Sequence, residues 1–201
     1  MDVAVIGTGF IGGTLGRALA GAGHRVTFGS RHPDDDPVVA DSSATVSSIA
    51  AALADAEVVI LALPGAAVGE FAATAGAQLE GRLVIDATNR MGEAVSNSRA
   101  ALPAGVRYAR AFNTLGGENM ADPVFGDERA DMFFSAPDAD RSVVETVIAG
   151  VGLRPVYVGE DQEALVDALF QLWIALAIKQ GRGRRLAFRL LEPKGAAERS
   201  S

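Results

Sequence analysis

Three glycines near the start of the chain have the spacing of a phosphate-binding loop. They form the sequence Gly7-Thr8-Gly9-Phe10-Ile11-Gly12, between the apolar, strand-like run Val3–Ile6 and the helix-like segment Phe10–Ala22. In a dinucleotide site, the first glycine permits a tight turn, the second lets a pyrophosphate approach the backbone, and the third allows close packing of helix on strand. Free N–H groups at the helix start then face the phosphate. An ordinary strand–turn–helix unit is the alternative, but the position of the motif favours a dinucleotide site.

The end of the second strand indicates which dinucleotide binds. The strand-like run Arg25–Gly29 is followed by Ser30, Arg31 and His32, with no carboxylate at its tip. NAD sites of this type place an acidic residue there for the ribose hydroxyls. A hydroxyl and a guanidinium suit a 2′-phosphate instead, and His32 could add a donor or stack on the adenine. We therefore expect NADP(H), with a surface turn carrying an incidental arginine as the alternative. Asp34–Asp36 come too late to replace the missing carboxylate, and we expect them to cap the next segment or to stay solvated.

Three further strand ends are expected to line the same crevice, because ligands bind outside the carboxyl ends of parallel strands. The polar side chains there could meet a ribose or a carboxamide, and for Asn113 and Thr114 we favour ligand contact. Asp86 is expected to be structural, since a strand-end aspartate often holds a loop through backbone hydrogen bonds. The cofactor-binding candidates at these ends are Ala62, Leu63, Pro64, Ala87, Thr88, Asn89, Ala111, Asn113 and Thr114.

The sequence offers no convincing catalytic acid or base. Neither Tyr108 nor Tyr157 has a lysine four residues later, which removes the acid of short-chain dehydrogenases. His24 precedes the second strand, at the wrong end of the sheet, and Lys179 lacks the asparagine partner found in β-hydroxyacid dehydrogenases. Carbonyl reduction at neutral pH needs a positioned acid, whereas reduction of a flavin-like ring needs mainly hydride alignment. The missing acid therefore points to a second cofactor as hydride partner.

Composition narrows the possible classes of protein. With 201 residues, 49% of them hydrophobic, the chain is long enough for about one packed domain and a small appendage. The net charge of −7 argues against a nucleic-acid surface, and the absence of cysteine excludes disulfides and thiolate metal sites. No apolar run approaches the ~20 residues of a membrane span, and no signal peptide is recognisable. We expect a cytoplasmic protein without a metal.

Strand and helix patterns alternate along most of the chain, which predicts an α/β fold of the Rossmann type with a doubly wound, mostly parallel sheet. We divide the chain into a dinucleotide-binding domain, residues 1–159, and a C-terminal helical segment, residues 160–201. Ser30–Ser43 is expected to be a loop. Further strands are expected at Val58–Leu63, Leu83–Asp86, Arg107–Phe112, Met132–Ser135 and Pro155–Val158, and helices at Val46–Ala54, Ala66–Leu79, Ser96–Ala101, Ala139–Val151, Glu163–Gln180 and Arg184–Leu191.

The C-terminal segment has two features of its own. The helix Glu163–Gln180 is apolar over more than one stripe, so part of it is expected in the core and part at a homodimer interface. The residues after it are basic, which fits either a solvated helix face or a site for an anionic ligand or acidic partner. The basic residues are Lys179, Arg182, Arg184, Arg185 and Arg189.

Four of these motifs together resemble the family of coenzyme F420-dependent NADP reductases. They are Gly7-Thr8-Gly9-Phe10-Ile11-Gly12, Gly29-Ser30-Arg31, Val84-Ile85-Asp86-Ala87-Thr88-Asn89 and Ala111-Phe112-Asn113-Thr114. The resemblance covers nearly the whole chain and extends to the reductase domain of six-transmembrane metalloreductases. It implies NADPH along Gly7–Ile11, with Ser30 and Arg31 on the 2′-phosphate. It also implies a deazaflavin or flavin against the nicotinamide, a cleft roofed partly by the C-terminal helices, and a homodimer.

Three functions follow from these patterns. The first is hydride transfer between NADP(H) and coenzyme F420 or a flavin. The second is NADPH-dependent reduction of a small imine or carbonyl, with a proton from Thr114, Asp86 or water. The third is a non-catalytic NADP(H) sensor that binds a partner protein. The NADP-type turn and the missing general acid favour the first.

Overall fold

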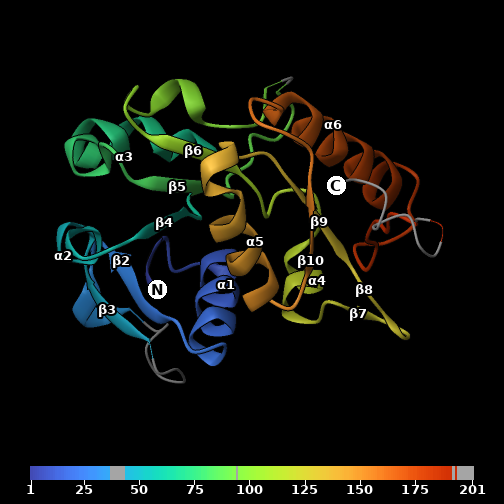
Figure 1. Ribbon diagram of the computed structural model, residues 1–201, viewed down its shortest axis with the longest axis horizontal. Helices are drawn as coiled ribbons and strands as arrows, with labels where there is room; N and C mark the ends of the chain where they lie inside the picture. The colour runs from blue at the N-terminus through green and yellow to red at the C-terminus, as the bar shows by residue number, and fades with distance from the viewer. Residues whose placement is uncertain (37–43, 94, 192, 194–201) are drawn as a thin grey trace.

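The computed structural model describes residues 1–36, 44–93, 95–191 and 193, and its centre is a six-stranded parallel sheet (Figure 1). The strand order is β3-β2-β1-β4-β5-β6, the order of doubly wound dinucleotide-binding folds. The predicted Rossmann-type fold is thereby confirmed. The strands are β1 (Asp2–Ile6), β2 (Arg25–Ser30), β3 (Thr45–Ser48), β4 (Val58–Leu61), β5 (Leu83–Asp86) and β6 (Arg107–Arg110).

Helices cover both faces of this sheet, and β1 and β4 present apolar side chains to both of them. Val3, Val5 and Ile60 belong to a core formed with α1 (Phe10–Gly21) and α5 (Arg141–Gly150). Ala4 and Ile6 point to the other face and pack with the helices α2 and α3. Burial on both sides explains why these strands read as continuous apolar runs. The helices of the second face are α2 (Ile49–Ala54) and α3 (Val68–Ala75), the latter flanked by the 3-10 turns η3 (Gly65–Ala67) and η4 (Gly76–Leu79).

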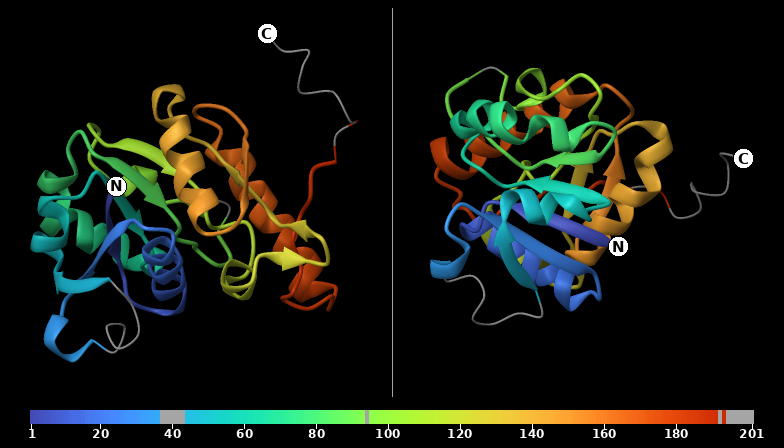
Figure 2. Two further views of the ribbon diagram at one scale, coloured as in Figure 1. Left: turned by 60° about the horizontal axis from the view of Figure 1, so that its bottom comes forward. Right: turned by 90° about the vertical axis from the view of Figure 1, so that its left-hand side faces the viewer.

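The C-terminal third extends this sheet beyond β6. A parallel pair, β9 and β10, is joined to β6 through an antiparallel bridge between Arg110 and Ser135. The helix α6 and the hairpin of β7 and β8 lie together on one side of the sheet (Figure 2, left). The elements are α4 (Gly117–Ala121), β7 (Val124–Phe125), β8 (Glu128–Arg129), β9 (Asp131–Phe134), β10 (Arg154–Tyr157) and α6 (Glu163–Ile174), with a π-helical turn η7 (Ala175–Lys179), and the 3-10 turns η5 (Arg99–Ala101) and η6 (Asp138–Asp140).

Two expectations about local structure were wrong. Val46–Ala54 is not a single helix: Thr45–Ser48 pairs with β2 as an edge strand, and the Ser48 hydroxyl then accepts a hydrogen bond from the Ala51 N–H as the cap of α2. Arg184–Leu191 is not helical, because its backbone is held by side chains of other elements. The Trp173 indole donates to the Leu186 carbonyl at 2.7 Å, and this fixes the segment as an extended strap across α4 and α6.

Several boundaries moved and some small elements were missed. Ser96–Ala101 forms only the 3-10 turn η5, while α4 and the hairpin of β7 and β8 had no sequence-based prediction. Within Ser30–Ser43, the turn η1 (Pro33–Asp35) is formed, and residues 37–43 lie outside the described part. No helix in the described ranges combines the length and apolar character needed to cross a membrane.

Candidate functional site

A cavity of about 600 Å³ lies at the carboxyl ends of β1, β2 and β4. Three loops that sequence analysis singled out form most of its wall, and side chains of α2 and α3 close the rest. The predicted site residues that line it are Gly7, Thr8, Gly9, Ser30, Arg31, His32, Ala62, Leu63 and Pro64. The lining residues that were not predicted are Ile6, Gly29, Asp35, Asp36, Ile49, Ala67, Glu70, Phe71 and Thr74.

The glycine loop has the geometry that its spacing predicted. Gly7 has φ +108°, and a Cβ there would lie 2.6 Å from the Ala62 carbonyl oxygen. A Cβ on Gly12 would lie 1.9 Å from the Gly7 oxygen, so both positions exclude a side chain. A Cβ on Gly9 would meet no atom within 4 Å. Gly9 therefore borders open space, which is what a pyrophosphate needs in order to reach the backbone.

The start of α1 offers unpaired N–H groups beside the cavity. Gly9 is the residue before the helix, no side chain of the described residues caps the first turn, and that turn carries no acidic residue. The first N–H groups of a helix have no partner inside it, and the helix dipole favours a negative charge at this end. The turn at Gly7, directly after β1, thus creates an anion-binding corner without any charged side chain.

The tip of β2 differs from expectation in one respect. Asp36 lies within reach of it: its Oδ2 atom accepts hydrogen bonds from the Thr8 hydroxyl at 2.7 Å and the Ser30 hydroxyl at 2.8 Å. The expectation that Asp34–Asp36 cap the next segment or stay solvated was wrong for Asp36, which is half-buried and accepts from these two hydroxyls. The turn η1 shortens the path and folds the chain back over the tip. Arg31 is exposed at the same place and forms no hydrogen bond or ion pair with any described residue.

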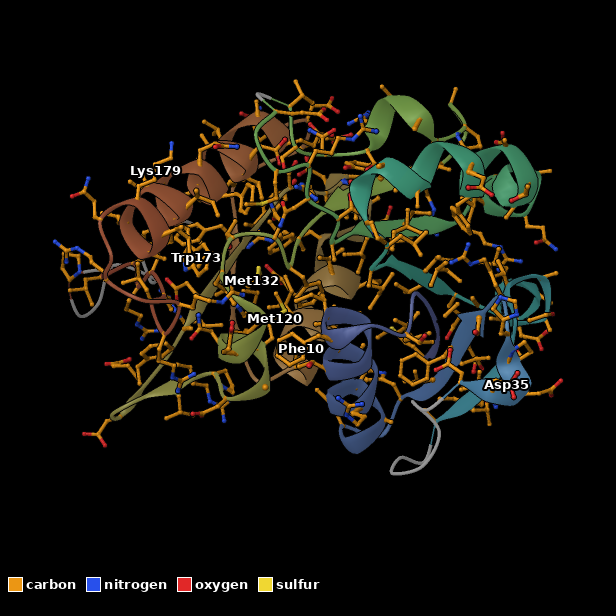
Figure 3. All side chains as sticks on the ribbon, turned by 180° about the vertical axis from the view of Figure 1, so that it is seen from behind. Phe10, Asp35, Met120, Met132, Trp173 and Lys179 are labelled. Atoms are coloured by element: carbon orange, nitrogen blue, oxygen red, sulfur yellow. The ribbon has the colours of Figure 1, made fainter. Side chains whose placement is uncertain are left out.

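The remaining predicted residues do not line the cavity. They lie at the start of α1 and around the ends of β5 and β6, the second half of the candidate site. Phe10 is exposed at the start of α1, and Figure 3 shows it beside Met120 of α4, on the side of Trp173 and far from Asp35. Ile11 and Asn89 are half-buried. Their neighbours Ala87, Thr88, Ala111, Asn113 and Thr114 are buried. Contact of this group with a cofactor stays a prediction.

The polar members of that group are held by the protein itself. The Thr88 hydroxyl bonds to the Ser98 hydroxyl at 2.8 Å, and the Thr114 hydroxyl donates to the Met132 sulfur at 3.6 Å. The Asn89 Oδ1 atom accepts from Arg110 at 3.1 Å. Asn113 is the exception: its Oδ1 atom is buried and has no hydrogen-bond partner in the described part of the chain.

A buried charged network supports this half, and sequence analysis missed most of it. Arg110 is fully buried and donates through Nε to Asp167 of α6 at 2.9 Å and through its terminal nitrogen to the Thr88 carbonyl at 2.5 Å. The same guanidinium lies 3.5 Å from Asp86. One guanidinium thus compensates part of the charge of two carboxylates and links α6 to the ends of β5 and β6.

Asp86 is structural, as expected. Its carboxylate accepts the backbone N–H groups of Thr88 at 2.8 Å and Ser98 at 2.7 Å, and the Tyr108 hydroxyl at 2.6 Å. Burial, and then the charge of Asp86, raise the pKa of Tyr108 well above its usual range. Asp167 likewise accepts from the backbone of Ser96 and from Asn97. These carboxylates accept hydrogen bonds throughout, so neither is placed to donate a proton.

The basic tail is bound to acidic residues of the same chain. Arg184 pairs with Glu118 at 2.6 Å, Arg185 with Asp122 at 2.5 Å, and Arg189 with Glu128 at 2.8 Å. The expectation of a solvated helix face was wrong, because the segment is an extended strap. The same pairs speak against an anion site formed by these three arginines. Among the described residues, no His, Cys, Asp or Glu side chains gather in a group that could hold a metal ion.

The family model that matches the sequence is described as NADP oxidoreductase, coenzyme F420-dependent, and it matches residues 2–90. This stretch carries the glycine loop, the tip of β2 and the end of β5. No curated protein matches the chain in sequence.

Solved structures match over most of the chain. A protein from Arthrobacter sp. FB24, provisionally described as an F420-dependent NADP reductase, has 24% identity and a TM-score of 0.77, over 96% of this chain and 100% of that one. A hypothetical protein from Sinorhizobium meliloti has 25% identity and a TM-score of 0.70, over 96% of both chains. An imine reductase from Streptomyces aurantiacus has 22% identity and a TM-score of 0.72, over 88% of this chain but 61% of its own.

These matches agree with the fold and with the motifs. Relatives at this level of identity show the same architecture, and the chain spans only about three fifths of the length of the imine reductase. The sequence match is more specific, because it falls on the segments that build the cavity. The predicted resemblance to coenzyme F420-dependent NADP oxidoreductases is confirmed over residues 2–90.

Proposed function

We propose that this chain is an NADP(H)-dependent oxidoreductase. The observation that carries the proposal is the cavity at the ends of β1 and β2, where an open glycine loop and a free helix start meet Ser30 and Arg31. Backbone N–H groups suit the pyrophosphate, and the serine hydroxyl and the guanidinium suit the 2′-phosphate. The apolar side chains of Ile49 and Phe71 supply the wall that an adenine needs.

The hydride partner in this proposal is coenzyme F420 or a flavin. Around the ends of β5 and β6, the acidic groups that the structure describes are engaged: Asp86 and Asp167 accept several hydrogen bonds each, and the Tyr108 hydroxyl donates a hydrogen bond to Asp86. The nicotinamide supplies hydride chemistry when bound. The residues of this chain would position it, since the network around Arg110 holds the strand ends rigid.

The description of the matching family and the missing acid support F420 or a flavin as the hydride partner. The fold shared with an imine reductase supports a second candidate function. That candidate is NADPH-dependent reduction of a small imine or carbonyl. In the structure, the Thr114 hydroxyl is turned to Met132 and Asp86 is saturated, so the proton would come from water. A non-catalytic NADP(H) sensor is the third candidate, and it predicts binding without turnover.

One anaerobic experiment separates these functions. Purified protein with NADPH is given F420, FMN, FAD, riboflavin or a cyclic imine in parallel, and NADPH oxidation is followed by absorbance. Turnover with F420 or a flavin is expected. Turnover with the imine alone, in the absence of any flavin, would replace the leading candidate with the second. NADPH binding without oxidation by any acceptor would favour the sensor.

We also propose that the protein is a cytoplasmic homodimer, with part of α6 at the interface. Leu165, Leu172 and Ile178 lie on α6 and η7 and are exposed by 53%, 47% and 50%. Val166, Phe170 and Trp173 of the same helix are buried, as a helix that lies partly in the core and partly at an interface requires. Size-exclusion chromatography with light scattering tests the dimer, and Leu172→Glu should release monomers. A wild-type mass of one chain would refute it.

A further inference from the structure

The carboxylate of Asp36 lies on two hydroxyls, those of Thr8 and Ser30, and the proposed function assigns the Ser30 hydroxyl to the 2′-phosphate. One oxygen, Oδ2, accepts from both Thr8 and Ser30, at 2.7 and 2.8 Å. Thr8 belongs to the glycine loop and Ser30 to the tip of β2, so the carboxylate bridges the two segments that must enclose the adenosine ribose. Asp36 is half-buried and lines the cavity.

These hydroxyls cannot serve two anions at once. Each has a single proton to donate, and both protons point to Asp36 in this structure. A 2′-phosphate placed on Ser30 would also come close to a like charge, which is unfavourable in a partly buried site. A ribose 2′-hydroxyl is attracted to the same carboxylate, because the hydroxyl can donate a hydrogen bond to Asp36.

We infer that Asp36 is a specificity-determining residue that competes with the 2′-phosphate and gives the site an affinity for NADH. The inference rests on the proposed dinucleotide function. With NADH, the carboxylate stays on Thr8 and Ser30 and accepts the ribose hydroxyl. With NADPH, the phosphate takes over the two hydroxyls and pairs with the unengaged Arg31, while Asp36 turns away into solvent. Selectivity between the two cofactors is then set by the balance between Asp36 and Arg31.

The position of Asp36 in the chain makes this exchange possible. It follows the short turn η1, which begins at Pro33 and whose residues are half-buried or exposed. None of the residues of η1 is buried, so moving the carboxylate does not open the core. A carboxylate fixed on β2 itself, as in typical NAD sites, could not be displaced in this way.

Binding of NADPH and of NADH to the wild type, Asp36→Asn and Asp36→Ala by titration calorimetry tests the inference. Asp36→Asn removes the charge and keeps the shape, so NADPH should bind about 5-fold tighter or more, and NADH about 2- to 5-fold weaker. Asp36→Ala should shift the preference in the same direction. Asp34→Asn is the matched control, because Asp34 is exposed on the same turn and does not line the cavity. It should change neither affinity.

The outcomes separate this inference from the proposed function. A ratio of NADPH to NADH affinity that is the same in wild type and Asp36→Asn, or one that falls, overturns the inference while leaving dinucleotide binding intact. Equal shifts in Asp34→Asn and Asp36→Asn also overturn it, because they would reflect net charge alone. Failure of both dinucleotides to bind the wild type and every variant overturns the proposed function, and the inference with it. Melting temperatures of the free proteins verify that the variants are folded.

Discussion

The two halves of the crevice are built in opposite ways. The half at β1 and β2 is an open cavity whose wall is backbone, small side chains and exposed groups such as Arg31. The half at β5 and β6 is filled with buried polar side chains bonded to one another, with Arg110 at the centre.

This difference indicates a division of labour. A site that binds a charged, flexible ligand benefits from open space and donors that can change partner, as Thr8 and Ser30 can. A site that aligns a reacting ring must be rigid, and a network of satisfied buried hydrogen bonds provides rigidity. The buried network at β5 and β6 should therefore determine the stability of the fold, whereas the cavity at β1 and β2 should tolerate substitutions without loss of folding.

The largest effect is expected for Arg110→Met. The substitution leaves Asp86 and Asp167 buried without their shared cation, and breaking a buried pair in this way costs about 3–5 kcal/mol. Thermal unfolding should show a melting temperature lower by roughly 2–4 °C for each kcal/mol. Arg25→Met is the control, since the Arg25 side chain is 80% exposed and pairs with Asp2 at the surface, and its melting temperature should barely change. Equal melting temperatures for Arg110→Met and Arg25→Met would show that the buried network does not determine stability.

The next effect is expected for Gly9→Val, in the open half. A Cβ at Gly9 meets no protein atom within 4 Å, and the backbone there is extended, so folding should be retained. The same side chain fills the space that a pyrophosphate needs, and NADPH affinity should fall by more than roughly 2 kcal/mol, the cost of leaving charged hydrogen bonds unmade. Gly21→Val, at the other end of α1 with equally open surroundings, is the control and should bind normally. Normal NADPH binding by Gly9→Val would mean that the ligand does not lie on this loop.

The half at β1 and β2 could be predicted from the sequence more completely than the half at β5 and β6. The open half depends on local patterns: a glycine loop between strand and helix, and a short polar turn after β2. Such patterns are contiguous in sequence, and the cavity contains Gly7–Gly9 and Ser30–His32 as predicted. Asp36 was misjudged because its position depends on how η1 folds back, which spacing along the chain does not reveal.

The bonded half could not be predicted, because its partners are distant in sequence. Arg110 ends the short strand Arg107–Arg110, whose sequence gives no sign that this arginine is buried, and its partner Asp167 is 57 residues away. The edge strand Thr45–Ser48 was misjudged for a related reason. Three of its four residues are polar and none is buried, so only pairing with β2 makes it a strand. A signal was present in one place, since Asp167 is an acidic residue inside an otherwise apolar helix.

A smaller effect, confined to one cofactor, is expected for Arg31→Ala. If the guanidinium pairs with the 2′-phosphate, NADPH affinity should fall by about 1.5–3 kcal/mol, the usual value of a hydrogen bond to a charged group. NADH affinity should stay within error, because NADH lacks that phosphate. Arg17→Ala makes the same change in net charge on the exposed face of α1 and should affect neither cofactor. Equal losses of NADPH and NADH in Arg31→Ala would show that Arg31 acts on the shared part of the cofactor.

The smallest effect concerns the two tyrosines, one inside the bonded half and one outside it. Burial and a hydrogen bond to Asp138 raise the pKa of Tyr157 to about 12, and the pKa of Tyr108 lies well above its usual range. Unfolded tyrosine ionises near 10, so both side chains stabilise the fold below that pH, and the contribution of Tyr157 is lost as the pH rises from about 10 to about 12.

Absorbance of tyrosinate at increasing pH measures this directly. The folded protein should show little tyrosinate at pH 11, and urea-unfolded protein should titrate near 10. Tyr157→Phe should remove the ionisation near 12 and leave the signal of Tyr108, which is expected to appear only as the protein unfolds, because the buried Tyr108 hydroxyl donates its hydrogen bond to the Asp86 carboxylate. Ionisation of Tyr108 at pH 10 in the folded variant would mean that water reaches the network, and the contrast between a rigid and an open half would then fail.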